Sequence, residues 1–175
     1  MGKQYMTAGM GDGGSCHPRD NIALRYIAEK LDLGYDLFSS IIHAREMQAK
    51  NMADTIVNFA KVNKMPVVIH GKAYKPNVPY EDGSYSKLVG YYVESAGVHD
   101  LYYVDPHTDD YYTPNSPCVF LLAHSPTTTY RYTGKDNQDK IYCNIPPGSI
   151  VIDPWRKFQK DNVTVIHYGN TRKKT

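Results

Sequence analysis

The sequence predicts an α/β protein in which a helical segment with one long helix precedes a Rossmann-like, mostly parallel, five-stranded sheet. Two observations support that fold. Apolar residues recur at helical spacing before residue 64, and short, continuous apolar runs follow residue 66. Such runs are typical of parallel strands that are covered on both faces. We therefore expect a helical segment over residues 1–64 and an α/β domain over residues 65–175.

Two helices are expected in the first part. Asp20 and Asn21 can begin a helix that Gly34 ends, and a longer helix follows from about Tyr35 to Val62. Its stripe consists of Phe38, Ile41, Ile42, Arg45, Ala49, Met52, Ala53, Ile56 and Ala60. So long a helix exceeds what a small core can cover, so its other face is expected to contact another domain or a second subunit.

The second part contains the expected strands. They are residues 67–69, 101–104, 118–122, 150–152 and 163–166. One helix is expected over residues 84–96, between the first two strands. The connection from Val104 to Cys118 is irregular, and residues 124–147 are polar and receive no assignment.

Composition excludes several classes of partner. A net charge of +2 indicates neither nucleic acid nor a membrane surface as a partner, and no apolar run approaches the roughly 20 residues of a membrane helix. The cysteines Cys16, Cys118 and Cys143 are too widely spaced for a disulfide framework or a zinc site, and the histidines have no ligand spacing. We expect a cytoplasmic protein without a metal, with Cys118 in the core and no role for Cys143.

Residues 13–20 read Gly-Gly-Ser-Cys-His-Pro-Arg-Asp and place the thiol of Cys16 on a glycine-rich turn just ahead of a helix. Backbone N–H groups and the positive helix end favour a thiolate there. Asp20, four residues later, is suited to orienting or deprotonating a water molecule. A structural cysteine beside a helix-capping aspartate fits the same spacing equally well.

These residues, followed by two helices, resemble the catalytic-cysteine segment of the UDP-glucose/GDP-mannose dehydrogenase family. Residues 71–75, Gly-Lys-Ala-Tyr-Lys, resemble that family's Gly-x-Ala-Phe-Lys. Weaker similarities are Tyr-Val-Asp-Pro at residues 103–106 and the Asp-containing strand end at residues 150–156. The order and spacing of all four agree, so the resemblance covers the family's central helical segment and its C-terminal UDP-binding domain.

The resemblance implies a chemistry. Family members oxidise the C6 alcohol of a nucleotide sugar to a carboxylate in two NAD-dependent steps, through a cysteine thiohemiacetal and a thioester. It implies that Cys16 is the nucleophile and that Asp20 positions or activates water. It further implies a nucleotide sugar, most simply a UDP-sugar, as substrate and a homodimer formed through the long helix. The residues expected to contact the sugar nucleotide are Gly13, Gly14, Tyr74 and Lys75.

The sequence also departs from the family pattern. Asp12 stands where an aromatic residue is frequent, and Asp82 stands where Thr-Asp-Asp-x-Arg-x-Ser has its arginine. That arginine is expected to help hold the cofactor, whose phosphates an acidic side chain would repel. Residues 9–14 fit Gly-x-Gly-x-x-Gly, but no apolar run precedes them, so they are not the dinucleotide fingerprint. No residue is assigned to cofactor binding.

The absence of that fingerprint leads to two hypotheses. In the first, the chain is the C-terminal part of a UDP-glucose 6-dehydrogenase-like enzyme. NAD is then bound mainly by a Rossmann domain outside this chain, in cis or in trans, and the chain alone is inactive. In the alternative, it is a non-catalytic sugar-nucleotide-binding or assembly module. The identity of the sugar and base, and whether the chain is a truncation, a split enzyme or a stand-alone module, stay open.

Overall fold

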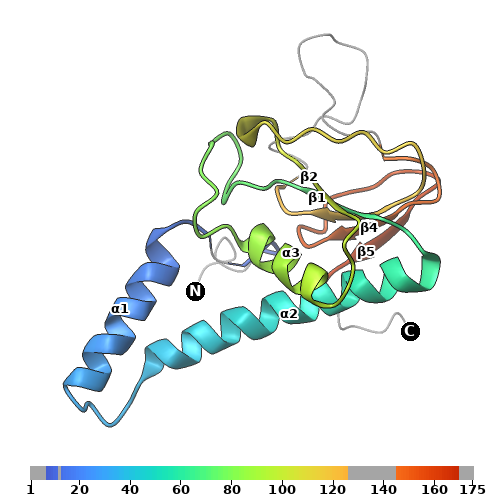
Figure 1. Ribbon diagram of the computed structural model, residues 1–175. Helices are drawn as coiled ribbons and strands as arrows, with labels where there is room; N and C mark the ends of the chain where they lie inside the picture. The colour runs from blue at the N-terminus through green and yellow to red at the C-terminus, as the bar shows by residue number, and fades with distance from the viewer. Residues whose placement is uncertain (1–6, 12, 126–144, 170–175) are drawn as a thin grey trace.

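One long helix connects the helical hairpin to the α/β part of the molecule. The computed structural model describes residues 7–11, 13–125 and 145–169. Helices α1 (Cys16–Lys30) and α2 (Leu37–Asn63) form a hairpin that projects from the α/β unit, and the C-terminal half of α2 runs along the sheet (Figure 1). The predicted helix from Tyr35 to Val62 therefore agrees with α2 to within two residues at each end.

Helix α1 begins at Cys16, so the predicted start at Asp20 and Asn21 was wrong by about one turn. Ser15 occupies the N-cap position without a side-chain hydrogen bond. Pro18 lies in the first turn, where backbone N–H groups have no helical acceptor, so the missing N–H costs no hydrogen bond. Cys16 is therefore the first residue of the helix rather than a residue of the preceding turn.

The second part contains a parallel sheet in the order β2-β1-β3-β4-β5. Its described strands are β1 (Val67–His70), β2 (Leu101–Val104), β3 (Val119–Leu122), β4 (Ile150–Asp153) and β5 (Thr164–His167). Each lies within one residue of a predicted run, so the predicted α/β fold with a five-stranded parallel sheet is confirmed. Helix α3 (Tyr85–Ser95) joins β1 to β2, and the irregular connection after β2 contains a short 3-10 helix, η2 (Pro106–Thr108).

Alternate residues of each strand face opposite sides of the sheet. Helices α2 and α3 cover one side, where Val67, Ile69 and Leu121 are buried. Connecting segments cover the other side, over a cluster that includes Val68, Phe120, Cys118 and Phe158. The burial of Cys118 confirms its predicted place in the core. Much of the predicted polar stretch 124–147, together with Cys143 and Asp12, lies outside the described residues.

This strand order determines where a ligand can bind. The connection from β1 leads to β2 on one side, and the chain then returns past β1 to β3 on its other side. In open parallel sheets, ligands bind outside the carboxyl ends of the strands where the direction of winding reverses. The residues that follow β1 and β3 are therefore expected to line a ligand-binding site.

His70, the last residue of β1, is a buried titratable group in this core. Its side chain is fully buried and packs edge-on against Phe120, with ring centroids 5.6 Å apart. Burial, together with the nearby His124, lowers the pKa of His70 to about 3. The imidazole is therefore neutral in the folded protein throughout the physiological range.

The free energy of unfolding should consequently fall as the pH is lowered from 6.5 towards 3. The unfolded chain binds a proton at His70 below its ordinary pKa, whereas the folded chain stays neutral until about pH 3. At pH 5 this difference amounts to about 2 kcal/mol. Urea unfolding at pH 7.5 and pH 5 should show a smaller pH-dependent loss in His70→Gln than in wild type or in the exposed control His99→Gln. Equal losses in all three proteins would contradict the assignment.

Candidate active site

The segment that follows β1, residues 71–75, lies directly against the glycine-rich turn that precedes Cys16. A Cβ atom at Gly13 would be 3.0 Å from the carbonyl oxygen of Tyr74, and one at Gly14 would be 3.3 Å from the Tyr74 ring. Both approaches are tighter than a side chain normally accepts, so only glycine lets the turn close onto Tyr74. Lys75 is exposed, with its Nζ atom 5.3 Å from the centroid of the Tyr74 ring. The four residues expected to contact a sugar nucleotide are therefore neighbours.

The same glycine-rich segment, residues 9–15, is called the glycine loop below. Two more aromatic rings support it. A Cβ atom at Gly9 would lie 2.8 Å from the indole of Trp155, and one at Gly11 would overlap the ring of Tyr85. The indole is fixed because its Nε1 donates to the carbonyl oxygen of Leu122 at 2.8 Å. The sequence analysis did not find these partners, although alternating glycines are typical of a backbone pressed against bulky groups.

Cys16 and Asp20 lie one turn apart on α1, and both are exposed. Between them, Arg19 donates from Nε to Oδ1 of Asp20 at 2.9 Å. The hydrogen bond to Asp20, the charge of that carboxylate and the neighbouring Cys16 raise the pKa of Arg19. Solvent screens this pair because its side chains are 69% and 57% exposed. The first turn of α1 therefore presents a thiol, a guanidinium and a carboxylate to solvent.

The two Asp-Pro segments have a structural role. Asp105 is 2% exposed, and its Oδ2 accepts hydrogen bonds from the backbone N–H groups of Lys72 and Ala73 at 3.0 and 2.9 Å. Its Oδ1 accepts from the N–H of His107 at 3.1 Å. The buried Asp153 carboxylate likewise accepts from the N–H groups of Trp155, Lys157 and Phe158. These carboxylates hold the loops after the strands in place.

His124, which follows β3, supports the same strand end. Its side chain is 3% exposed, and its Nε2 lies 3.0 Å from the carbonyl oxygen of Ala73. Burial lowers the pKa of His124, so the neutral ring donates that hydrogen bond. The ring also fills the space beside Gly71, where a Cβ atom would lie 2.5 Å from it. His124 therefore fixes the backbone that leads to Tyr74.

A cleft of about 500 Å³ opens at this edge of the sheet. Its volume is within the range of small-molecule sites. Its lining residues either precede the glycine loop or follow β1, β3 and β4. This position agrees with the one that the strand order favours for a ligand. The lining residues are Thr7, Ala8, Pro76, Asn77, Ser125, Trp155 and Lys157. They offer an aromatic face, hydroxyl and amide groups and an ammonium group.

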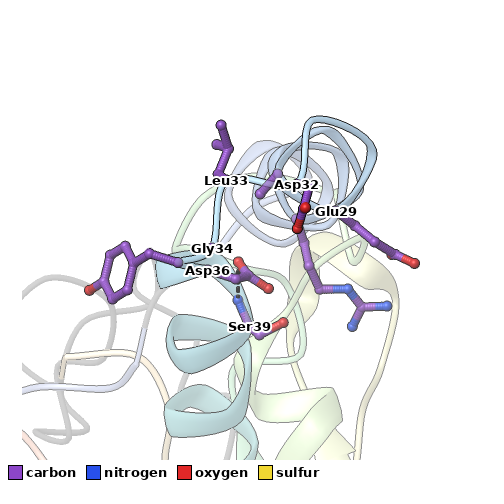
Figure 2. Close-up of a pocket in the computed structure, with 9 residues that line it drawn as sticks. Glu29, Asp32, Leu33, Gly34, Asp36 and Ser39 are labelled. Carbon is purple, nitrogen blue, oxygen red and sulfur yellow. Dashed lines mark hydrogen bonds between the residues drawn. The ribbon is translucent and has the colours of Figure 1, made fainter.

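A second hollow, of about 470 Å³, lies far along the hairpin at the turn between α1 and α2. Figure 2 shows Asp36 directed at the start of α2, where its carboxylate accepts from the N–H groups of Phe38 and Ser39. Glu29 and Asp32 also line this hollow. These three carboxylates outnumber the one guanidinium of the lining, that of Arg25, and would repel a diphosphate, so we do not assign the nucleotide to this hollow.

Two kinds of feature are absent from the part of the chain that the structure describes. No group of three or more His, Cys, Asp or Glu side chains is arranged to hold a metal ion. No helix within residues 7–11, 13–125 and 145–169 is long and apolar enough to cross a membrane.

Comparison with known proteins identifies the class of fold. Two solved structures match 94% of this chain with a TM-score of 0.61 each. They are a GDP-mannose dehydrogenase from Pseudomonas aeruginosa, 17% identical, and a UDP-glucose dehydrogenase from Pyrobaculum islandicum, 19% identical. At such identities the likeness concerns the fold, which is the Rossmann-like fold of dehydrogenase domains.

Sequence comparison finds similarity to one family. Residues 1–47 match the model of the UDP-glucose/GDP-mannose dehydrogenase family, central domain. UDP-glucose 6-dehydrogenase TuaD of Bacillus subtilis is 32% identical over 78 residues, 44% of this chain. The mouse UDP-glucose 6-dehydrogenase is 28% identical over 128 residues, 71% of this chain. In sequence and in fold, the chain is thus similar to members of the UDP-glucose/GDP-mannose dehydrogenase family.

The chain spans only part of its relatives. The matched region covers 17% of the Bacillus subtilis protein and 25% of the mouse protein. It covers 41% and 39% of the two solved chains. What the whole relatives bind and do therefore applies to this chain only as a proposal.

Replacing Asp105 by alanine should lower the free energy of unfolding by about 3 kcal/mol, because three backbone N–H groups then lose their acceptor inside the protein. Urea denaturation measures the loss. The matched control is Asp161→Ala, at an exposed position, which should change stability by no more than about 0.5 kcal/mol. If both variants are equally stable, the carboxylate of Asp105 does not hold this loop.

Proposed function

We propose that this chain is the C-terminal part of an NAD-dependent nucleotide-sugar dehydrogenase, which oxidises the C6 alcohol of a UDP-sugar to a carboxylate through covalent adducts at Cys16. In this proposal residues 1–64 are a central helical segment and residues 65–175 a nucleotide-binding domain. One observation carries it: the turn before Cys16 packs on the strand end that contains Tyr74. The cleft of about 500 Å³ is lined by Pro76 and Asn77, which directly follow the same strand end.

The nucleotide sugar would lie across this edge of the sheet. The cleft beside Trp155 accepts the nucleoside, because an aromatic face and groups such as Asn77 suit a base. The ammonium groups of Lys75 and Lys157 suit the diphosphate. The sugar then extends along Gly13 and Gly14, whose lack of side chains permits close approach.

Cys16 would act as the nucleophile in the second oxidation. Its Sγ attacks the C6 aldehyde carbon, a carbon–sulfur bond forms, and the carbonyl π electrons move to oxygen. Uptake of a proton then gives the thiohemiacetal. The first turn of an α-helix leaves backbone N–H groups without a helical acceptor, and those of Cys16 and His17 would stabilise the negative charge on oxygen.

Asp20 would assist the hydrolysis of the later thioester. It takes a proton from a water molecule as the water oxygen attacks the carbonyl carbon. The carbon–sulfur bond breaks, the sulfur of Cys16 leaves with the bonding electrons, and the sugar carboxylate is released. Arg19, which donates a hydrogen bond to Asp20, would help to orient this carboxylate during the step.

NAD, which accepts the hydride in both oxidations, does not fit the described residues. Asp82 is exposed, and its carboxylate would repel the cofactor's phosphates. The glycines of residues 9–14 pack on aromatic side chains instead of lying open to a pyrophosphate. The proposal therefore assigns NAD to residues other than these.

A non-catalytic sugar-nucleotide-binding or assembly module is the second candidate. The acidic residue at position 82 favours it, because a chain that no longer takes part in hydride transfer has no use for a cofactor-binding cation there. Such a module would bind the nucleotide sugar without bringing it to Cys16.

Alkylation of Cys16 distinguishes the two candidates. Cys16 is exposed, whereas Cys118 is buried and its pKa is raised to about 11 by burial, so iodoacetamide at pH 7 should label Cys16 at least 100-fold faster. If the sugar reaches Cys16, saturating UDP-glucose should slow that labelling at least threefold, as mass spectrometry of the peptides can measure.

Two lysine substitutions serve as controls for this experiment. Lys75→Gln should lose the protection by UDP-glucose, while Lys64→Gln, at the far end of α2, should keep it. A Cys16 that stays inert while Cys118 reacts would remove the catalytic proposal. Calorimetric binding of UDP-glucose without protection of Cys16 would favour the non-catalytic module.

The hairpin also supports the proposed homodimer. Ten large hydrophobic side chains between residues 22 and 47 are exposed. They are Ile22, Leu24, Tyr26, Ile27, Leu31, Leu33, Tyr35, Leu37, Ile41 and Met47. An apolar surface of this kind on a projecting element is typical of an interface, and we assign it to a second copy of the chain through α2.

Sedimentation analysis at tens of micromolar should accordingly detect a dimer. Ile41→Glu introduces a charge into the apolar surface of α2 and should weaken dimerisation more than tenfold. His43→Glu, an exposed polar position on the same helix, is the matched control and should leave the dimer intact. A monomeric wild-type protein would contradict the assignment.

A further inference from the structure

The segment from Asp82 to Tyr85 contacts the glycine loop at two separate places. Tyr85, the first residue of α3, is 3% exposed, and its ring occupies the space where Gly11 would otherwise carry a side chain. Gly83 lies against the C-terminal end of the loop. A Cβ atom there would overlap the carbonyl oxygen of Gly14 and lie 3.0 Å from the backbone nitrogen of Ser15.

The ring of Tyr85 cannot move away from the loop easily. The guanidinium carbon of Arg45, on α2, lies 5.4 Å from the ring centroid. The Tyr85 hydroxyl donates to the backbone carbonyl oxygen of Arg45 at 3.5 Å. Side chains from the core side of α2 and α3 bury the rest of the ring. Tyr85 therefore links the glycine loop to both helices that cover the sheet.

Gly83 is held equally firmly. Its φ angle of +69° is one that a side chain disfavours. On either side of it, the N–H of Ser84 donates to the carbonyl oxygen of Glu81 at 3.0 Å, and Glu81 pairs with Lys72 at 3.1 Å. The hydroxyl of Ser86 bonds to the carbonyl oxygen of Lys72 at 3.3 Å. The backbone of Gly83 is thus a fixed support directly before Cys16.

Cys16 itself has little else to hold it. Ser15, Cys16 and His17 are exposed, whereas Gly14 is buried. The N-cap of α1 makes no side-chain hydrogen bond. The position of the thiol in the described part of the chain therefore depends on how the glycine loop is held.

We propose that Tyr85 and Gly83 are positioning residues for Cys16, which hold the glycine loop at its middle and at its C-terminal end and so fix the start of α1. This inference rests on the proposed function for its catalytic meaning. It gives a role to the very segment in which the cofactor arginine of the family pattern is replaced by Asp82. Small displacements of a nucleophile cost large factors in rate, so such a support matters for the reaction.

Hydrogen exchange tests the positioning directly and does not require a nucleotide. In Tyr85→Val, amides of residues 9–16 should exchange at least tenfold faster than in wild type, because the ring that supports Gly11 is gone. Amides of β3 should be unchanged. Tyr85→Phe keeps the ring and should behave as wild type, as should Tyr91→Val, an exposed tyrosine on the same helix.

A compensating pair makes the test specific. Gly11 does not have a positive φ, so Gly11→Ala should disturb the loop only through its overlap with the Tyr85 ring. The single variant should raise exchange in residues 9–16, and Gly11→Ala combined with Tyr85→Val should restore it at least partly. The rate of Cys16 alkylation, measured relative to that of Cys118 in the same samples, should follow the same order. It should differ from the wild-type rate in both single variants and lie closer to it in the double variant.

Two results would overturn the proposal. One is unchanged exchange of residues 9–16 in Tyr85→Val. The other is an equal increase in residues 9–16 and in β3, which would mean that Tyr85 contributes only to overall stability. If Tyr85→Val does not fold, Gly11→Ala alone decides, since it leaves the core side of the ring in place. A Cys16 that nucleotide never protects would contradict the proposed function but leave this positioning result standing.

Discussion

The close backbone approach of the glycine loop to the sheet edge is the contact on which the rest of the site depends. Gly13 and Gly14 lie close against Tyr74, so a Cβ atom at either position would require a shift of a few tenths of an ångström, and the φ of +97° at Gly14 also disfavours a side chain. Because α1 begins immediately after the loop, the same contact determines where Cys16 and Asp20 lie. This approach brings the start of α1 to the edge of the sheet at which we propose that the nucleotide binds.

Most of the regular structure could be predicted because local signals specify it. The runs at β1 and β3 are apolar and continuous since both faces of the strands are covered, and α2 keeps a helical stripe over its buried half. The start of α1 could not be placed in this way. Residues 16–19 carry no apolar spacing and include a proline, so the N-terminal turn depends on tertiary contacts.

The site was predictable only where a motif is local. The strand end at Tyr74 and Lys75 was recognised from five consecutive residues, and the structure sets it beside the glycines. Tyr85 and Trp155 contact the same loop from more than 70 residues away in sequence, so no pattern could join them to it. Conversely, the Asp-Pro segments matched the family pattern although Asp105 holds loops rather than substrate. The similarity of a motif thus identifies a family more readily than it identifies a catalytic group.

A crystal structure of the chain with UDP-glucose at saturating concentration would locate the nucleotide sugar relative to Cys16. We expect the nucleoside in the cleft beside Trp155, the diphosphate near Lys75, and C6 of the glucose within reach of the Cys16 sulfur. UDP-glucose bound elsewhere, for instance at the turn between α1 and α2, or bound in the cleft with its sugar directed away from the glycine loop, would contradict this expectation.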